Sequence, residues 1–411
     1  MTIVVFTRRL PEDFLGGAEI HALLFSQALV KHGHQVSVVT GGRKDVVETR
    51  GRLTIIRLRA FSYPYPFQTL LLLYWRFRFQ RRVRQIVSES DIVHAFDLDS
   101  ILLLSGWKAI AAKLVATVQD YSIICPGGDF LAIGGRPCHC HAHHRFQCHR
   151  QYEGNIFQRF YCRIAYPIRF AVRSSLFLRL STVVFISRFV AKQFQRVFGK
   201  KLRGQMTVIG NFIPDSWLKG KRRPLRKIYD ILFVGRVAPY KGIEAFLLAL
   251  SLLVKRKLHF RACIVGAGNI DMYRKHVSEL GLTANVSFTG EVAYPDIQAF
   301  YLQSKILVVP SIWPEPCGRT VIEGMGMGSV VIATDSGGTP ELLRDSFSGF
   351  LVPAGDPVAL SQKLLFVLTR YSKLSPLRRR ARAVVRRRFL SNQVVRQYET
   401  IYQQLSNPFL P

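Results

Sequence analysis

The chain has 411 residues, of which 48% are hydrophobic and 20% are charged, with Gly and Pro at ordinary frequencies. This composition is typical of a globular protein and excludes a fibrous or intrinsically disordered chain. The length exceeds what one hydrophobic core usually serves, so we expect two domains of roughly 200 residues each. The first residues read as a buried strand rather than a signal peptide, and the apolar runs are far shorter than the ~20 residues of a membrane-spanning helix. We therefore expect a cytoplasmic protein.

The charge balance is unusual, because 58 Lys and Arg stand against 26 Asp and Glu, a formal net charge of +32. Residues 51–88, 154–214 and 357–398 contain no acidic side chain at all. A field of this sign attracts phosphorylated substrates, anionic lipid surfaces or nucleic acid. A solvated basic surface without a specific partner is the plainest alternative. We favour an enzyme that acts on a lipid-linked acceptor at an anionic membrane surface, and we rank nucleic acid last.

The first half of the chain alternates short apolar segments with helical ones. Residues 2–6 read as a strand, the loop 7–17 ends in two glycines, and residues 18–31 have helical spacing up to His32-Gly33. With a second strand at 35–40, this order makes a βαβ unit. Further short buried strands are expected in this half at 91–95, 114–118, 182–186 and 206–209.

The pattern changes near residue 211, where a basic, Pro-bearing segment reads as an exposed linker. A second series then follows, with strands expected at 229–235, 261–265, 286–288, 306–309 and 330–334 and helices at 243–254, 320–327 and 340–344. Two consecutive α/β series predict two Rossmann-like domains, each a doubly wound parallel sheet. We expect an N-terminal domain at 1–213, a linker at 214–227, a second domain at 228–385 and, within 386–411, a helix that returns to the first domain.

Two loops that follow predicted strands carry residues suited to phosphate. Gly16 and Gly17 precede the first predicted helix, where a backbone can approach an anion near the positive helix end. A plain tight turn is an equally good explanation of this pair. The stretch 235–242 places Arg236 and Lys241 after the first strand of the second domain, and two cations there suit a diphosphate. Ordinary surface cations are the alternative.

A third loop combines carboxylates with a helix start. Glu315 follows the predicted strand 306–309, and Glu323 lies about two turns into the next helix. Buried carboxylates require hydroxyl or cationic partners, and the hydroxyls of a sugar and a ribose are suitable ones. The backbone N–H groups from Cys317 to Thr320 point out of the helix start toward a phosphate.

Together these segments resemble the retaining glycosyltransferase family 4, of GT-B fold. The resemblance rests on E-x7-E at Glu315 and Glu323, on Gly-Gly-Ala-Glu at 16–19, on G-R-x4-K-G at 235–242 and on G-G-x-P-E at 337–341, and it covers nearly the whole chain. It implies two Rossmann-like domains facing a central cleft. It also implies transfer of a hexose-type sugar from a nucleoside-diphosphate sugar to a glycan or lipid-linked acceptor, with retained anomeric configuration and no metal or other cofactor in catalysis.

The same resemblance assigns roles to individual residues. Glu323 would bind the ribose hydroxyls, and Glu315 would hold hydroxyls of the transferred sugar. Arg236 and Lys241 would grip the diphosphate. The full donor site predicted in this way comprises Gly16, Gly17, Gly235, Arg236, Lys241, Gly266, Glu315, Cys317, Gly318, Arg319, Thr320 and Glu323.

The sequence departs from its relatives on the acceptor side. Many of them read His-Asp where this chain has Gln119 and Asp120. Glutamine can hydrogen-bond a sugar hydroxyl but cannot exchange a proton near neutral pH. Gln119 therefore either takes over a positioning role or marks a reduced or specialised activity. His94, at the end of the strand 91–95, is a further catalytic candidate in the cleft, with a satisfied histidine under a loop as the alternative.

Residues 138–149 contain three Cys and five His. These ligands are ample for a structural zinc ion, for which Cys138, Cys140, Cys148 and His149 are the candidates. The spacing does not match a common zinc finger, so a disulfide or free residues in an acceptor loop stay open. A catalytic metal is not expected.

Aromatic residues and Arg interleave at 70–84 and again at 159–179. That mixture suits a headgroup interface, so we predict peripheral contact with the cytoplasmic face of a membrane. Amphipathic helices packed on the core are the alternative. Two other functions also stay open: a different GT-B activity such as a nucleotide-sugar epimerase, and a catalytically degenerate, zinc-bearing protein that binds nucleic acid through its charge. The Pro-Glu-Pro segment and E-x7-E argue against the epimerase.

Overall fold

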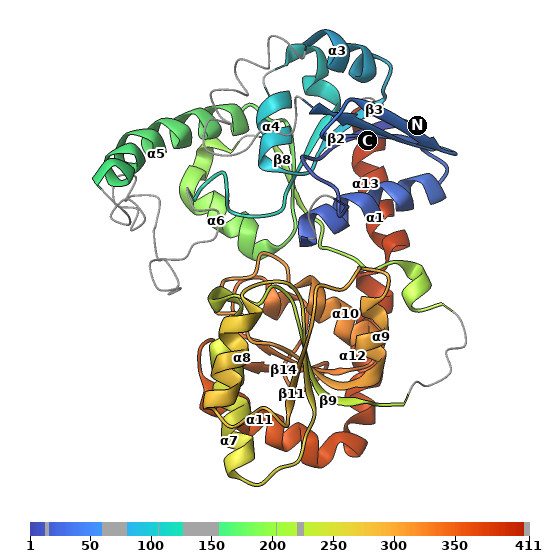
Figure 1. Cartoon of the computed structure of the whole chain (residues 1–411). Helices are drawn as coiled ribbons and strands as arrows, with labels where there is room; N and C mark the ends of the chain where they lie inside the picture. Colours follow the sequence, from blue (N-terminus) through green and yellow to red (C-terminus); the bar gives the residue numbers. More distant parts are fainter. Residues whose placement is uncertain are drawn as a thin grey trace. The chain divides into compact units, whose positions relative to one another are not determined.

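The computed structural model describes residues 1–12, 16–59, 80–105, 107–125, 156–202, 204–219 and 226–406. These residues form two compact units, drawn in Figure 1. Among them, unit 1 comprises the residues up to Asn211 together with those from Ser391 onward, and unit 2 comprises Phe212–Leu390. Within these ranges the chain passes from one unit to the other after Asn211 and again after Leu390.

Unit 1 is built on an eight-stranded sheet with the order β3-β4-β2-β1-β5-β6-β7-β8. Its strands are β1 (Thr2–Phe6), β2 (Gln35–Gly41), β3 (Val46–Arg50), β4 (Leu53–Leu58), β5 (Ile92–Ala95), β6 (Leu114–Val118), β7 (Thr182–Phe185) and β8 (Gln205–Val208). Neighbouring strands run parallel except for the pair of β3 and β4 at one edge. Its helices are α1 (Gly17–Lys31), α3 (Gln80–Ser88), α4 (Leu98–Leu104), α5 (Ile156–Phe177), α6 (Arg188–Phe198) and α13 (Ser391–Ser406).

The last helix, α13, is fastened to unit 1 by polar contacts as well as by its apolar face. Its Tyr398 and Tyr402 are completely buried. On its outer side the Glu399 carboxylate lies 3.0 Å from His32 Nδ1 and 2.8 Å from His34 Nε2, in the turn after α1. Helix α13 therefore belongs to unit 1, although it follows unit 2 in the chain.

Unit 2 is built on a six-stranded sheet, all parallel, with the order β11-β10-β9-β12-β13-β14. Its strands are β9 (Tyr229–Val234), β10 (Ala262–Val265), β11 (Val286–Gly290), β12 (Ser304–Val309), β13 (Val330–Thr334) and β14 (Phe350–Val352). Its helices are α7 (Ile243–Lys255), α8 (Ile270–Glu279), α9 (Ile297–Gln303), α10 (Arg319–Met327), α11 (Pro357–Arg370) and α12 (Ser375–Arg388). The prediction of two Rossmann-like parallel sheets is confirmed.

The apolar runs of the sequence explain the central strands of unit 2. A parallel strand is covered on both faces, so it reads as a continuous apolar segment rather than an alternating one. Ile231 and Phe233 of β9 and Val308 of β12 pack with Phe246 and Leu250 of α7 in one core, each no more than 2% exposed. Each such side chain contributes roughly 1.5–3 kcal/mol by burial. This core holds the loops at the carboxyl ends of the strands in place.

Three features differ from the prediction. The segment 214–227, expected as an exposed linker, begins with a 3₁₀ helix, Asp215–Trp217. The Trp217 indole is only 6% exposed and stacks on the Tyr294 ring at 5.4 Å, because a side chain of that size is stabilised by burial. The helix expected at 340–344 is a single 3₁₀ turn, Thr339–Glu341. Unit 2 extends to Leu390, beyond the predicted end at 385.

None of the described helices has the length and hydropathy needed to cross a bilayer. The aromatic and basic stretch 70–84 lies mostly outside the described residues. The second such stretch, 159–179, falls largely on α5, which contains Pro167 in its interior. Neither stretch carries an argument for membrane contact here.

Candidate active site

Each sheet has one switch point at which its strand order reverses. In unit 2, β9 lies between β10 and β12, and in unit 1, β1 lies between β2 and β5. Loops that leave adjacent strands in opposite directions open a crevice there, and ligands of such sheets bind at that point. The predicted site residues are concentrated in the loops that follow these strands.

The loops at the switch point of unit 2 are joined to one another by hydrogen bonds. The backbone N–H groups of Ile312 and Trp313, after β12, both donate to the Tyr240 carbonyl, after β9, at 3.2 and 3.0 Å. The Gly338 N–H, after β13, donates to the Glu315 carbonyl at 2.6 Å. Three loops that are far apart in sequence therefore form one rigid platform.

Lys241 and Glu315 form the charged centre of this platform. Lys241 Nζ lies 2.5 Å from Glu315 Oε1, which also accepts a hydrogen bond from the Ser311 hydroxyl at 2.5 Å. The Lys241 ammonium also lies over the Trp313 ring, 4.7 Å from its centroid. The Glu315 side chain is 10% exposed and that of Lys241 is 21% exposed, so both reach the surface at this point. Ser311 and Trp313 are neighbours that sequence reasoning did not select.

Two glycines allow these loops to meet. Gly242 has φ +74° and Gly337 has φ +64°, a region that favours glycine. A Cβ atom on Gly242 would lie 1.8 Å from the Pro310 carbonyl oxygen, and one on Gly337 would lie 2.3 Å from the Glu315 carbonyl oxygen. Glycine is therefore required at both positions for β9, β12 and β13 to present their loops side by side.

Glu323 is buried one helical turn from Arg319 on α10. Its Oε1 accepts a hydrogen bond from Arg319 Nε at 2.9 Å, and its Oε2 accepts one from the Tyr301 hydroxyl at 2.6 Å. The Arg319 guanidinium lies over the Tyr294 ring at 4.7 Å. The side chains of Arg319 and Glu323 are 8% and 3% exposed. Burial, together with the negative charge of Glu323 and the hydrogen bond to it, holds the pKa of Tyr301 well above its usual value.

The remaining predicted donor residues of unit 2 surround this platform. Gly318 is the N-cap of α10, with Cys317 buried beside it and Thr320 in the first helical turn. Gly235 and Gly266 follow β9 and β10, and a Cβ on Gly266 would lie 1.9 Å from the Gly235 carbonyl oxygen. Arg236 is exposed after β9. Gly16, the N-cap of α1, and Gly17 belong to unit 1.

Unit 1 has a cavity of about 180 Å³ at its own switch point. The lining residues that matter here are polar groups following β1, β5 and β6 or beginning α1: Arg8, Glu19, Asp97, Asp99, Gln119 and Asp120. Four of these are carboxylates, which is notable in a chain with few acids. The sequence contained a signal for two of them, because Asp97 and Asp99 closely follow the predicted strand 91–95, but neither was selected as a site residue.

The carboxylates of this cavity are held by backbone groups and by Arg8. Asp97 caps α4 by accepting from the Ser100 N–H at 2.8 Å, and it accepts from the Arg8 N–H at 2.5 Å. Asp99 pairs with the Arg8 guanidinium at 3.2 Å. Burial, reinforced by the negative charge of Asp97, raises the pKa of Asp99 to about 6 in spite of Arg8. Burial likewise raises the pKa of Glu19.

Gln119 lies at this cavity, at the end of β6. Within the described part of the chain its amide nitrogen is buried and has no hydrogen-bond partner. A buried amide donor without a partner is costly, so a ligand oxygen in the cavity would stabilise it.

His94 does not line the cavity, which corrects its selection as a catalytic candidate. Its ring is completely buried, with Nδ1 2.5 Å from the Tyr402 hydroxyl and Nε2 2.7 Å from the Thr117 hydroxyl. Burial, together with the nearby His21, lowers the pKa of His94 well below its usual value. It is a neutral core histidine, because β5 turns this side chain toward α13.

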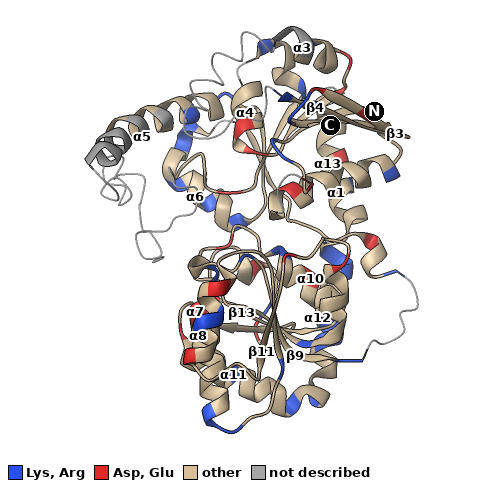
Figure 2. Cartoon of the chain, in the orientation of Figure 1, with Lys and Arg blue, Asp and Glu red and all other residues tan. Residues whose placement is uncertain are grey.

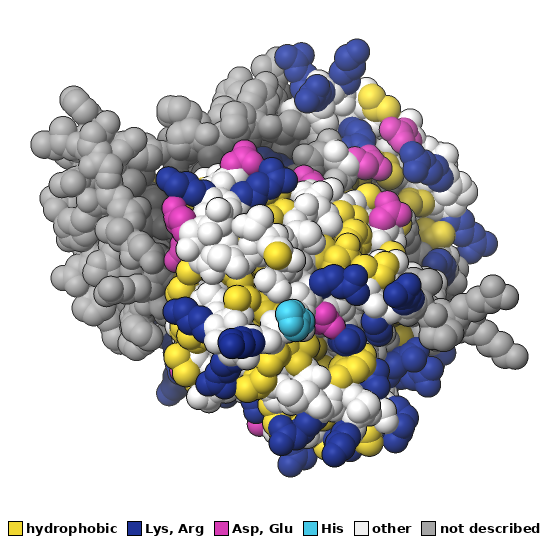
Figure 3. Space-filling model, turned by 60° about the horizontal axis from the view of Figure 1, so that its bottom comes forward, with side chains coloured by type: hydrophobic (Ala, Val, Ile, Leu, Met, Phe, Trp, Pro, Cys, Tyr) yellow, Lys and Arg dark blue, Asp and Glu magenta, His cyan; other side chains and the backbone are white. Residues whose placement is uncertain are grey.

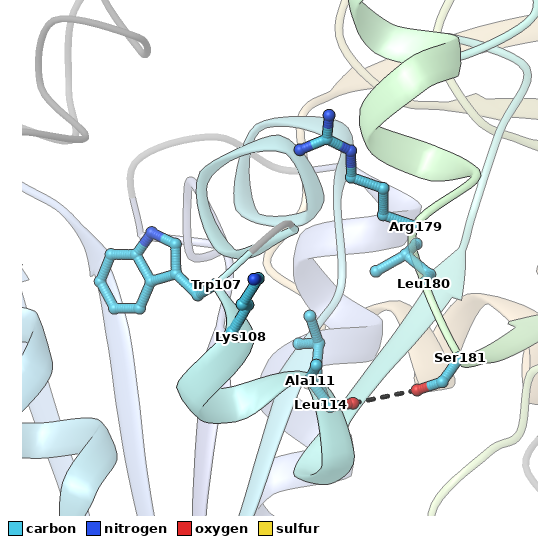
Figure 4. A pocket seen from close by; sticks show the side chains of 7 residues that line it. All are labelled: Trp107, Lys108, Ala111, Leu114, Arg179, Leu180 and Ser181. Atoms are coloured by element: carbon cyan, nitrogen blue, oxygen red, sulfur yellow. Dashed lines mark hydrogen bonds between the residues drawn. The ribbon is translucent and has the colours of Figure 1, made fainter.

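A second cavity of unit 1, of about 310 Å³, lies at the opposite edge of the same sheet (Figure 4). Trp107, Lys108 and Ala111 contribute from the segment before β6, and Arg179 and Ser181 from the segment before β7. The Ser181 hydroxyl donates to the Ala111 carbonyl at 3.0 Å and closes its floor. Because this cavity is at the amino ends of the strands, it contains none of the predicted site residues.

The predicted zinc ligands Cys138, Cys140, Cys148 and His149 lie outside the described residues. Within the described ranges no group of three or more His, Cys, Asp or Glu side chains is arranged to hold a metal ion. Cys125, Cys263 and Cys317 are buried thiols.

Both halves of the chain match models of known families. The model described as Glycosyltransferase Family 4 matches residues 15–217, and that described as Glycosyl transferases group 1 matches residues 219–384. An uncharacterized glycosyltransferase of Methanocaldococcus jannaschii is 24% identical over 384 residues, which cover 88% of this chain and 87% of that protein. A phosphatidyl-myo-inositol mannosyltransferase of Mycobacterium leprae is 32% identical over 179 residues, 42% of this chain and 46% of the relative.

Solved glycosyltransferase structures share the fold over its whole length. Sucrose-phosphate synthase from Thermosynechococcus elongatus aligns with a TM-score of 0.77 at 20% identity, covering 98% of each chain. Anabaena HepE in complex with UDP-glucose aligns with a TM-score of 0.67 at 19% identity, covering 98% of this chain and 99% of that one. The two Rossmann-like units thus define a GT-B protein. The chain belongs to the group 1 glycosyltransferases, as its sequence resemblance predicts.

Proposed function

We propose that the chain transfers a hexose-type sugar from a nucleoside-diphosphate sugar to a hydroxyl group of a glycan or lipid-linked acceptor. The anomeric configuration is retained, and no metal takes part. The observation that carries this proposal is the meeting of Lys241, Glu315 and the start of α10 at the switch point of unit 2. That platform offers a cation for a diphosphate and a carboxylate for sugar hydroxyls within hydrogen-bond distance of each other.

The chemistry of the donor follows from these groups. As the bond from the sugar to the diphosphate breaks, negative charge grows on the leaving phosphate oxygen. Lys241, Arg236 and the N–H groups at the start of α10 stabilise that charge, which is the role a divalent ion plays in other transferases. When the diphosphate pairs with the Lys241 ammonium, the Glu315 carboxylate exchanges its ion pair for hydrogen bonds from hydroxyls of the sugar. The ion pair between them therefore holds both groups in place before the donor binds.

Glu323 is proposed to receive the ribose hydroxyls. Each of its oxygens accepts one hydrogen bond from the protein and retains a lone pair for another. Because Arg319 and Tyr301 fix the carboxylate, little ordering is required when the nucleoside arrives. Gly16 and Gly17 of unit 1 are proposed to contribute N–H groups to the diphosphate at the positive end of α1.

The carboxylate-lined cavity of unit 1 is the proposed acceptor site. Carboxylates accept hydrogen bonds from hydroxyl groups, and the amide nitrogen of Gln119 donates one to a sugar oxygen. Gln119 itself cannot exchange a proton near neutral pH. A front-face reaction, in which the leaving phosphate takes the acceptor proton, suits such a site, because it needs no protein base.

The proposal agrees with what known relatives bind. HepE has been solved with UDP and with UDP-glucose, and Arabidopsis starch synthase IV with ADP and acarbose. The mannosyltransferase relative is named for phosphatidyl-myo-inositol. A cytoplasmic enzyme facing a membrane that holds its acceptor fits the same pattern.

Turnover tests the proposal directly. The protein is incubated with UDP-, GDP-, ADP- and dTDP-sugars, with and without EDTA, and release of the nucleoside diphosphate is measured. One nucleotide series should react at the same rate in EDTA, and NMR of the product should show the donor's anomeric configuration. Lys241→Ala is the matched inactive control. Donor binding without any release or transfer would instead support a catalytically degenerate protein.

A further inference from the structure

Helix α12 presents one face to unit 2 and an arginine-rich face to solvent. Its buried residues Leu377, Ala381 and Val385 recur every four positions and are at most 3% exposed. On the opposite side Arg379 and Arg387 are exposed. The exposed Ala383 lies between them, and the exposed Pro376 precedes them. At ~1.5 Å per residue the two arginines stand about 12 Å apart along the axis. Figure 2 shows basic and no acidic residues on this helix.

Four arginines on and next to this face are positioned by uncharged groups. Arg378 donates to the Tyr371 hydroxyl at 2.9 Å, Arg379 to the Ser375 hydroxyl at 3.3 Å, and Arg380 and Arg388 to the backbone carbonyls of Phe347 and Glu341. The guanidinium groups of Arg378, Arg380 and Arg388 also lie over aromatic rings at 4.4–4.9 Å. These contacts orient the cations without neutralising them.

The positive charges of this surface also oppose one another. Burial lowers the pKa of Arg382, and the neighbouring Arg386 lowers it further. Burial lowers the pKa of Lys227 to about 8, with additional repulsion from Arg378 and Lys305. Such crowding destabilises the folded chain, and a bound anionic partner would relieve it.

The shape of this surface favours an extended anionic partner over a small anion. Its arginines stand on the outside of a helix, with small residues between them that permit close approach of a flat surface. The Phe347 ring next to them is 42% exposed and has the guanidinium groups of Arg344 and Arg380 at 5.8 and 4.9 Å. Exposed aromatic and Arg side chains together are typical of a headgroup interface. In the view of Figure 3, Lys and Arg side chains likewise lie among hydrophobic ones.

We propose that the outer face of α12, with the adjacent Phe347, docks unit 2 on an anionic lipid bilayer. The purpose of this docking rests on the proposed function, because it keeps the enzyme beside a lipid-linked acceptor. The lipid phosphates supply negative charge opposite the arginines of α12. The docking itself needs neither donor nor acceptor.

Vesicle binding by two charge-matched variants tests the proposal. Arg379→Gln with Arg387→Gln removes two charges from α12, and Lys192→Gln with Arg196→Gln removes two from the exposed side of α6 in unit 1. The full chain is sedimented with phosphatidylglycerol–phosphatidylcholine vesicles and with pure phosphatidylcholine vesicles at 150 mM salt. A basic residue near an anionic surface contributes roughly fivefold to binding, so the α12 variant should bind about 25-fold more weakly than wild type. The α6 variant should bind like wild type.

Three outcomes would overturn the proposal: unchanged binding of the α12 variant, an equal loss in both variants, or wild-type binding to RNA without binding to anionic vesicles at that salt. Thermal unfolding of the α12 variant should match or exceed that of wild type, because removing a repelling charge does not destabilise the helix. Donor-induced stabilisation, measured on the same variant, separates the two ideas. If it persists while vesicle binding is unchanged, the docking surface is wrong and the proposed function stands. If vesicle binding falls as expected but no donor stabilises any form, the proposed function fails alone.

Discussion

Replacing Glu323 by Gln tests the most deeply buried part of the proposed site. The change leaves the Arg319 guanidinium, whose side chain is 8% exposed, without its carboxylate. The new amide N–H₂ also faces a hydrogen-bond donor, either Arg319 Nε or the Tyr301 hydroxyl. Removing one partner of a buried ion pair costs about 3–5 kcal/mol. For a unit of nearly 200 residues, each kcal/mol lowers the melting temperature by roughly 2–4 °C. Glu323→Gln should therefore melt roughly 6–20 °C below wild type.

Two comparisons isolate the reason for this loss. Asp271→Asn breaks the ion pair of Asp271 with Arg274, whose side chains are 92% and 61% exposed, and should leave the melting temperature unchanged. A double-mutant cycle with Arg319→Met measures the coupling between Arg319 and Glu323. Because the double variant buries no unpaired charge, it should be more stable than Glu323→Gln alone.

Circular dichroism or fluorescence melts, each with and without a nucleotide sugar, provide the assay. Glu323→Gln should also lose donor-induced stabilisation at temperatures where it is still folded. A melting temperature equal to that of wild type would refute the reasoning, because it would mean that Arg319 does not depend on this carboxylate.

Three further predictions concern other parts of the two units. Lys241→Ala should retain the fold but lower kcat by roughly 10²–10³, as loss of a charge-stabilising group does, and a near-wild-type rate of nucleotide release would misplace the donor site. Gly337→Ala should reduce both the stability of the fold and the affinity for the donor, because its Cβ would lie 2.3 Å from the Glu315 carbonyl oxygen. An unchanged melting temperature would show that this loop can move aside. Asp99→Asn should stabilise the protein above pH 6 by up to about 3 kcal/mol, since a pKa raised from near 4 to about 6 makes ionisation costly in the folded state. Below the unfolded pKa the wild-type carboxyl is protonated in both states, so the gain should vanish near pH 4; a gain independent of pH would exclude this cause.

The sequence predicted the central strands and the donor motifs because both depend on short-range pattern. Parallel strands are continuous apolar runs, and their carboxyl ends meet at one edge, so Lys241 after β9 and Glu315 after β12 were expected near each other without knowledge of the contact. The structure adds that they touch, and that Ser311 completes the contact.

Other features depend on packing that no local pattern reveals. The Arg319–Glu323 contact has an i,i+4 spacing visible in the sequence, but Tyr301 reaches Glu323 from another helix. His94 ends a strand as a cleft residue would, yet its side chain faces α13, more than 300 positions away in the chain. The strands β3 and β4 were not predicted: β4 lies in the acid-free stretch 51–88, which was interpreted through its charge, and β3 directly precedes that stretch.

The central claim is that the loops after β9, β12 and β13 of unit 2 bind a nucleoside-diphosphate sugar without a metal. The most direct measurement is a thermal shift of wild type and Lys241→Ala with UDP-, GDP-, ADP- and dTDP-sugars, each with and without EDTA. At about 100 times its Kd a ligand of the native state adds roughly 2.7 kcal/mol, which moves the melting temperature by several degrees. The account predicts such a shift for one nucleotide series in wild type, unchanged by EDTA and lost in Lys241→Ala. No shift with any nucleotide, or a shift of equal size in Lys241→Ala, would contradict it.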